Sequence, residues 1–113
     1  MKRIFRHTRS VAFSIAVVTL ALPAAVRAHD DAEKTFKANC AACHAPDGSG
    51  STAAGKALKA QDLRSPEVQK KSDEDLAELI TKGKNKMPAY DKKLTDAEVK
   101  EVIAYIRGLC KKQ

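Results

Sequence analysis

The sequence predicts an all-α fold. Three segments, over residues 32–40, 72–83 and 95–109, place apolar side chains at helical spacing, and the last two begin with a Ser/Thr-x-x-Asp/Glu pattern that caps helices. No segment after residue 28 sustains the apolar–polar alternation of a β-strand. The chain has 113 residues, which allows one domain and excludes a multidomain enzyme.

The first 28 residues have the layout of a secretory signal peptide. Basic residues precede an apolar run over residues 11–22, and Val26 and Ala28 occupy the −3 and −1 positions of a cleavage site. The run is 12 residues long, whereas a membrane-spanning helix takes about 20. We therefore expect general secretory export, cleavage after Ala28 and a mature domain over residues 29–113 in a bacterial periplasm. An uncleaved amino-terminal anchor is the alternative.

The formal charge of +7 belongs mostly to this leader. Residues 1–28 contain five basic and no acidic residues, so residues 29–113 hold 16 basic against 14 acidic residues and carry +2. A nearly neutral mature chain argues against nucleic acid as its partner.

The mature chain is predicted to begin with a helix over residues 32–40, capped at Asp30 or Asp31, in which Phe36 and Cys40 lie one turn apart. A short helix over residues 53–60 follows a loop rich in Gly and Ser.

Two further helices begin with capping boxes. Ser72 pairs with Asp75, and Gly83 is placed to end that helix, while Thr95 pairs with Glu98. The apolar faces that follow comprise Leu76, Leu79 and Ile80 in the first helix, and Val99, Val102, Ile103, Ile106 and Leu109 in the second. The mature chain has only a small core without Trp, and domains of this size often need a disulfide, a metal or a cofactor to be stable.

Residues 40–44 read Cys-Ala-Ala-Cys-His, the C-x-x-C-H pattern of covalent c-type haem attachment. Two thiols three residues apart lie on one side of a helical turn, so Cys40 and Cys43 can both add to the vinyl groups of one haem. His44 follows directly and can bind the iron as its proximal ligand. A thioredoxin-type site lacks its βαβ context, structural zinc lacks a convergent fourth ligand, and a 40–43 disulfide leaves His44 unexplained.

Met87 is the candidate for the second axial ligand. It is the one Met after the leader and lies before Pro88 in a polar loop between two helices, where a core-filling Met is out of place. Ligation by His44 and Met87 raises the reduction potential and indicates electron transfer. The alternatives are a five-coordinate haem protein that binds a gas or turns over peroxide, and a haem-free structural module.

The chain resembles the small monohaem class I cytochromes c over most of residues 31–109. The matching motifs lie at residues 36–44, 83–90 and 94–106, and the run over residues 81–89 is similar to soluble cytochromes that carry electrons to photosystem I. Respiratory relatives share much of that run. The resemblance implies three to four helices wrapped around one haem, with the amino- and carboxy-terminal helices crossing, and an electron carrier rather than an enzyme.

Two features depart from this family. Many members carry a Gly-Pro whose carbonyl orients the proximal His, whereas the corresponding region here reads Ala53–Leu58, so the partner of His44 is unidentified. Cys110 is the third cysteine and has no partner in the motif. It is either a small half-buried residue at a helix end or the site of an occasional intermolecular disulfide in an otherwise monomeric protein.

Lysines crowd the stretch around Met87, and acidic residues gather at residues 73–78. The run of lysines is either a solvated face or a docking surface for acidic redox partners at an exposed haem edge. We expect the protein to reach membranes only through its partner complexes. We call these residues the lysine cluster; they are Lys82, Lys84, Lys86, Lys92 and Lys93.

Overall fold

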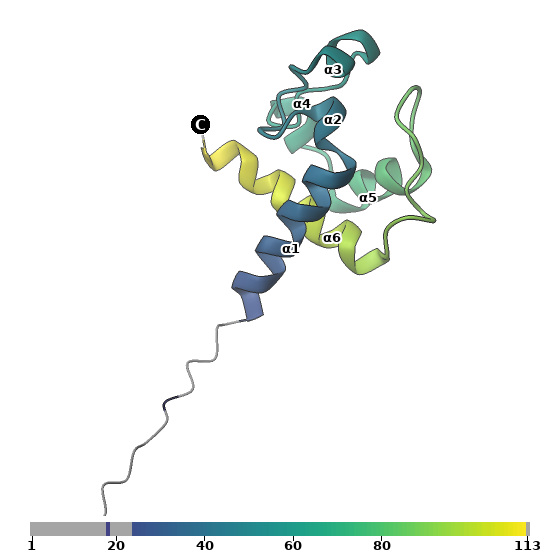
Figure 1. Cartoon of the computed structure of the whole chain (residues 1–113). Coiled ribbons are helices and arrows are strands. Elements are labelled where there is room, and N and C mark those ends of the chain that lie inside the picture. The colour runs from purple at the N-terminus through teal and green to yellow at the C-terminus, as the bar shows by residue number, and fades with distance from the viewer. Residues whose placement is uncertain (1–17, 19–23, 113) are drawn as a thin grey trace, which may run out of the picture.

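The structure is a computed structural model that describes Val18 and residues 24–112 (Figure 1). The basic start and most of the apolar run of the predicted leader lie outside the described residues. Within the described part of the chain, no helix is long and apolar enough to cross a membrane.

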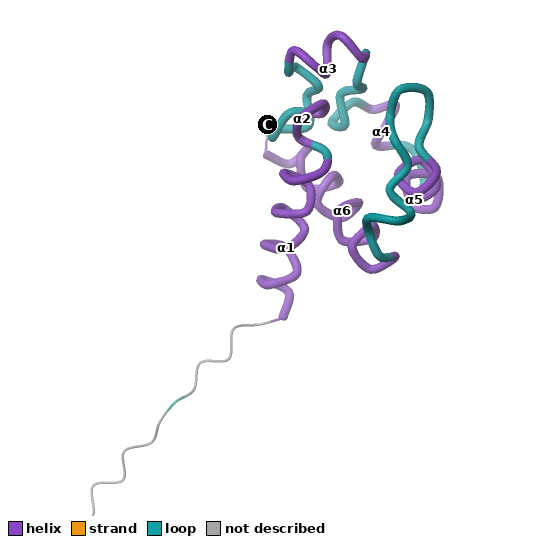
Figure 2. Tube along the Cα trace, turned by 45° about the vertical axis from the view of Figure 1, so that its right-hand side comes forward, coloured by secondary structure: helices purple, strands orange, loops and turns teal. Residues whose placement is uncertain are grey.

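The described residues form six α-helices and a final 3-10 turn over Cys110–Lys112 (Figure 2). The helices are α1 (Ala24–Asn39), α2 (Ala41–His44), α3 (Ala53–Leu58), α4 (Pro66–Gln69), α5 (Asp73–Lys82) and α6 (Asp96–Leu109). The only extended pairing among these residues is an isolated antiparallel bridge between Lys84 and Met87. The predicted all-α class is confirmed.

The core lies where α1 crosses α6, with α5 packed against α6 beside it (Figure 1). Phe36 of α1 and Val102 of α6 are fully buried, and the rings of Phe36 and Tyr105 meet with centroids 5.1 Å apart. Leu76 and Ile80 carry the buried face of α5. The predicted crossing of the terminal helices is therefore confirmed.

The half of the molecule that holds α2, α3 and α4 contributes little to this core. None of the residues of α2 is buried, Gly55 is the buried residue of α3, and Val68 is the buried residue of α4. Leu58, at the end of α3, keeps 40% of its surface exposed. Most of the buried apolar side chains therefore come from α1, α5 and α6.

The predicted cap of the first helix is wrong. Asp30 and Asp31 lie inside α1, which begins at Ala24, because the preceding alanines are strong helix formers and continue the helix upstream. Both predicted capping boxes are present: Ser72 with Asp75 at α5, and Thr95 with Glu98 at α6.

The short helices follow local signals. The predicted helix over residues 53–60 is α3, which ends two residues early because Lys59 takes a left-handed conformation with φ 56°. Helix α4 was not predicted, although its signal is in the sequence: Ser65 caps it by accepting from the Val68 amide, and Pro66 occupies its first position.

Arg107 of α6 fastens the α4–α5 connection to the core. Its guanidinium donates to the carbonyls of Gln69, at 2.8 Å, and Lys71, at 2.6 Å, and to the Asp73 carboxylate at 2.8 Å. The side-chain amide of Gln69 in turn donates to the Ile106 carbonyl at 3.3 Å. These bonds fix the start of α5, whose far end leads into the Met87 loop.

Candidate functional site

The C-x-x-C-H residues form one tight helical turn directly after α1: Cys40 is the N-cap of α2, and the other four residues are α2 itself. The Cys40 amide donates to the Phe36 carbonyl at 2.8 Å, and the His44 amide donates to the Cys40 carbonyl at 2.9 Å. Because Phe36 is anchored in the core, this turn is held on a rigid helix end. Cys40 and Cys43 are both free and half-buried, and burial raises the pKa of the Cys40 thiol to about 11.

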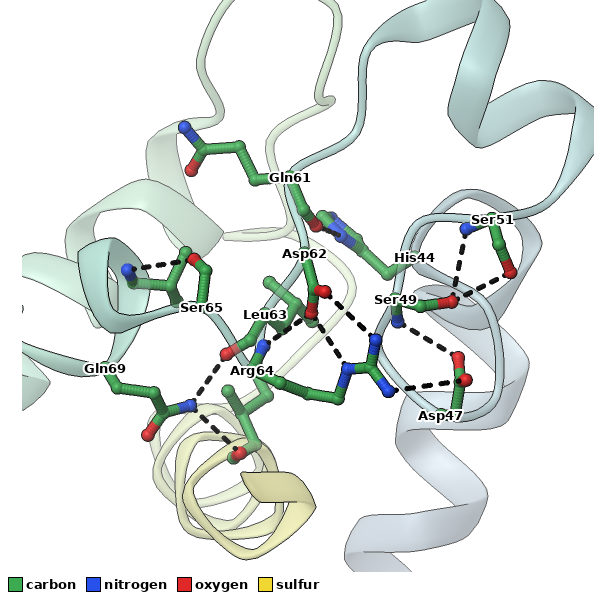
Figure 3. Close-up of polar contacts among 12 residues, drawn as sticks. His44, Asp47, Ser49, Ser51, Gln61, Asp62, Leu63, Arg64, Ser65 and Gln69 are labelled. Carbon is green, nitrogen blue, oxygen red and sulfur yellow. Dashed lines mark hydrogen bonds and ion pairs between the residues drawn. The ribbon is translucent and has the colours of Figure 1, made fainter. Parts of the chain in front are cut away.

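His44 is oriented by a backbone carbonyl. Its Nδ1 lies 3.0 Å from the carbonyl oxygen of Gln61 (Figure 3). A carbonyl oxygen can only accept, so Nδ1 is the donor, and in the neutral imidazole Nε2 then has the free lone pair. This is the arrangement of a metal-binding histidine, in which the second ring nitrogen donates to a fixed oxygen.

Gln61 is the site residue that sequence reasoning missed. The Ala53–Leu58 region, where many family members carry a Gly-Pro, does not supply the partner of His44. The contact uses a main-chain oxygen, which every residue type has, so no side-chain signature marks position 61. Only the path of the chain after α3 reveals it.

The loop after His44 is shaped to pass close to the motif. Gly48 and Gly50 take φ values of 80° and 71°, and the Gly50 amide donates to the His44 carbonyl at 2.7 Å. The Thr52 hydroxyl donates to the Ala42 carbonyl at 2.8 Å and accepts from the Gly55 amide at 2.9 Å. Thr52 thus caps α2 and α3 together.

Met87 lies on a separate hairpin-like loop after α5. The Lys84 and Met87 backbones exchange hydrogen bonds of 3.1 and 3.0 Å around a turn in which Asn85 takes φ 54°. Met87 is half-buried and packs against the core cluster.

Tyr90 ties the Met87 loop to the cysteine turn. Its hydroxyl donates to the Asn39 carbonyl at 2.8 Å, and its amide donates to the Ile80 carbonyl at 3.0 Å. Burial, together with the nearby Cys40 and Cys43, raises the pKa of Tyr90. The loop that carries Met87 is therefore fixed to the residue that precedes Cys40, although the two segments are distant in the sequence.

The donor set fits a c-type haem better than the alternatives. It offers two free thiols, an imidazole with a free Nε2 and a half-buried thioether. Over residues 24–112, no group of three or more His, Cys, Asp and Glu side chains is placed to hold a metal ion. A structural zinc site therefore has no support among these residues.

His29, Cys110 and the lysine cluster lie outside this turn. His29 packs edge-on against Tyr105, with ring centroids 5.8 Å apart, and Tyr105 is a core residue. Cys110 is free and half-buried at the end of α6. All five members of the lysine cluster are exposed, and Lys82 pairs with Glu78 at 2.7 Å.

Gly83 makes room for the Met87 loop, which leads to a testable prediction. It has φ 70° and ψ 171°, and a Cβ there would lie 2.6 Å from the Met87 carbonyl oxygen and 2.8 Å from the Ala89 nitrogen. We expect Gly83→Ala to reduce the free energy of unfolding by about 1–3 kcal/mol, because this backbone conformation is essentially restricted to Gly. We also expect the substitution to displace Met87. Denaturant unfolding and the optical spectrum measure the two effects.

Gly108→Ala is the matched control. Gly108 lies in α6, and a Cβ there meets nothing within 4 Å. Alanine should therefore raise the free energy of unfolding by about 0.5–1 kcal/mol and leave the spectrum unchanged. Equal effects of the two substitutions would refute the role given to Gly83.

Comparison with known proteins identifies the class. A family model described as cytochrome C oxidase, cbb3-type, subunit III, matches residues 27–106. The solved KustC0563 c-type cytochrome superimposes with a TM-score of 0.65 at 36% identity, covering 70% of this chain and 96% of that one. The fold and the C-x-x-C-H turn, together with these matches, define a monohaem class I c-type cytochrome.

The curated relatives place the chain within that class. Cytochrome c6 of Nostoc sp. (strain PCC 7120) is 37% identical over 110 residues, covering 96% of this chain and 94% of the relative. Cytochrome c6 of Porphyra purpurea is 34% identical over 95 residues and covers 84% of both chains. The chain belongs to the class I c-type cytochromes and is cytochrome c6-like. It is an electron carrier and not an enzyme, and its family implies covalently bound haem c.

Proposed function

We propose that the mature chain is a periplasmic one-electron carrier whose single haem c is attached through Cys40 and Cys43 and ligated by His44 and Met87. The observation that supports this most is the 3.0 Å contact between His44 Nδ1 and the Gln61 carbonyl, which leaves Nε2 as a ligand. The bound haem supplies reversible Fe(III)/Fe(II) chemistry.

Each residue of the site has a separate task in this proposal. The Cys40 and Cys43 thiols would hold the group where α1 meets α2, so it could not exchange with solution. His44 presents Nε2 in a fixed orientation, and Met87 offers a soft thioether that favours Fe(II). With His44 and Met87 both holding the iron, small ligands would be excluded from it, and the same residues would hold it in both oxidation states.

The experiment that separates this carrier from its rival is the addition of CO to the reduced protein. The five-coordinate alternative leaves the sixth position open and binds CO readily. The proposed carrier shows no CO-induced change and, when oxidised, has the weak near-infrared band of a sulfur–iron bond.

The export assignment is part of the proposal. Cleavage after Ala28 would cut within α1 and make His29 the new terminus of that helix. Mass spectrometry of the exported protein gives the terminus directly, and a terminus well before His29 contradicts the assignment. The donor, the acceptor and the choice between a photosynthetic and a respiratory pathway are set by partners outside this chain.

The exposed lysines offer a docking surface for acidic redox partners. Lys86 and Lys92 are exposed, whereas Lys82 is paired with Glu78. We expect Lys86→Glu with Lys92→Glu to slow second-order electron transfer to the native acceptor about tenfold or more at low salt, because electrostatic steering raises encounter rates by 10–10³. Stopped-flow kinetics over a range of ionic strength measure this.

Lys100→Glu is the matched single control for the docking surface. Lys100 is exposed on α6 and lies outside the lysine cluster, so its reversal should change the rate less than reversal at Lys86 alone. An acceptor rate whose salt dependence is the same in the double variant and the parent protein contradicts the docking role.

A further inference from the structure

Arg64 joins the two segments that flank His44 (Figure 3). Its Nε and Nη2 donate to the two carboxylate oxygens of Asp62 at 2.9 and 3.0 Å. Its Nη1 lies 3.7 Å from the Asp47 carboxylate, in the loop that follows His44. The Arg64 side chain is only 24% exposed, so this is a partly buried, bidentate contact rather than a loose surface pair.

Backbone amides on both sides of this bridge donate hydrogen bonds that connect it to the main chain. The Ser49 amide donates to Asp47 at 3.0 Å, and the Arg64 amide donates to Asp62 at 2.9 Å. The Leu63 amide reaches the Gly48 carbonyl at 2.8 Å. We call this set, Asp47, Asp62 and Arg64, the arginine bridge.

The segment that contains Gln61 has no helix of its own. It lies between the end of α3 and the start of α4, where Lys59 has already turned the chain with φ 56°. The position of the Gln61 carbonyl therefore depends on its neighbours. Asp62 is the next residue along the chain, and the guanidinium of Arg64 lowers the pKa of its carboxyl, which keeps the bridge charged.

We propose that Arg64 is a positioning residue: by bridging Asp47 and Asp62 it holds the Gln61 carbonyl on His44 Nδ1 and thereby sets the reduction potential of the haem. This proposal rests on the proposed function. The arginine bridge acts on the iron only through the imidazole, and no member of it is assigned as a ligand.

The sign of the effect follows from the hydrogen bond. A firm Nδ1–H···O contact makes the imidazole a stronger electron donor and favours Fe(III). Loosening that contact weakens the donor and raises the potential. Removing the positive charge of Arg64 leaves two carboxylates unbalanced and has the opposite effect, so the test must keep the charge.

Arg64→Lys keeps the charge and removes the planar fork that grips Asp62. We expect the midpoint potential to rise. We also expect the His44 Nδ1 proton of the reduced protein to exchange with solvent about threefold to tenfold faster, the factor for one net hydrogen bond. Optical redox titration and proton NMR measure these two effects.

Arg107→Lys is the matched control. Arg107 is 27% exposed and makes a similar clamp, but to Gln69, Lys71 and Asp73. The Arg107→Lys variant should lose stability as Arg64→Lys does, but its midpoint potential and the exchange rate of its His44 Nδ1 proton should not change. Unchanged values in Arg64→Lys, or equal changes in the two variants, would overturn the proposal.

Asp47→Asn is the second test variant, used if the Arg64→Lys protein does not accumulate. It removes the longer contact of the arginine bridge and keeps the Arg64–Asp62 pair. Faster exchange of the Nδ1 proton supports the proposal, and an unchanged rate contradicts it. Parent protein that lacks covalent haem, or that binds CO when reduced, instead contradicts the proposed function, so the two failures are distinguishable.

Discussion

Replacing both Cys40 and Cys43 by Ala is expected to abolish covalent haem in the exported protein. In the proposed attachment each thiol supplies one thioether, and the described chain offers no other cysteine in this turn. The half of the molecule that holds α2 to α4 buries few apolar side chains of its own, so little folded protein should accumulate without the haem. Haem that stays with the chain on a denaturing gel, or after acid–acetone extraction, is the measured quantity.

Cys110→Ala is the control for this experiment. Cys110 is free at the far end of α6 and takes no part in the turn, so its loss should leave the covalent haem content unchanged. Full haem content in the double variant, or its loss in Cys110→Ala, would show that the attachment site has been misassigned.

Met87→Ala is expected to open the sixth position of the iron. The near-infrared sulfur–iron band should vanish, the reduced protein should bind CO, and the midpoint potential should fall. The fall should exceed about 60 mV, a tenfold change in the one-electron equilibrium, because the thioether that favours Fe(II) is gone. Optical spectra and redox titration of the two proteins give all three results.

Lys86→Ala, next to Met87, controls for disturbance of the loop. Lys86 is exposed at the turn, so its truncation should keep the band and the potential close to their original values. A Met87→Ala protein that retains the band would show that another residue ligates the iron.

The sequence predicts those parts of the fold that local chemistry determines. Ser72 with Asp75 and Thr95 with Glu98 cap α5 and α6 as expected, because a cap depends on residues within one helical turn. The start of α1 was mispredicted, since the residues before Asp30 are also good helix formers and local signals do not choose between two compatible starts.

The candidate site is predictable only where side-chain identity carries the signal. C-x-x-C-H and Met87 can be read from the sequence, but the Gln61 carbonyl cannot, because its role depends on where the chain returns after α3. Gly83 shows the same limit. Its use as a helix stop is local, whereas the close approach of the Met87 carbonyl to it is a tertiary contact.

The most direct test of a covalent, His44- and Met87-ligated haem is an optical redox titration of the exported protein. The account predicts one reversible one-electron transition, with the near-infrared sulfur–iron band present when oxidised and lost on reduction. A protein with no reversible haem transition, or one whose oxidised form lacks that band throughout, would contradict it.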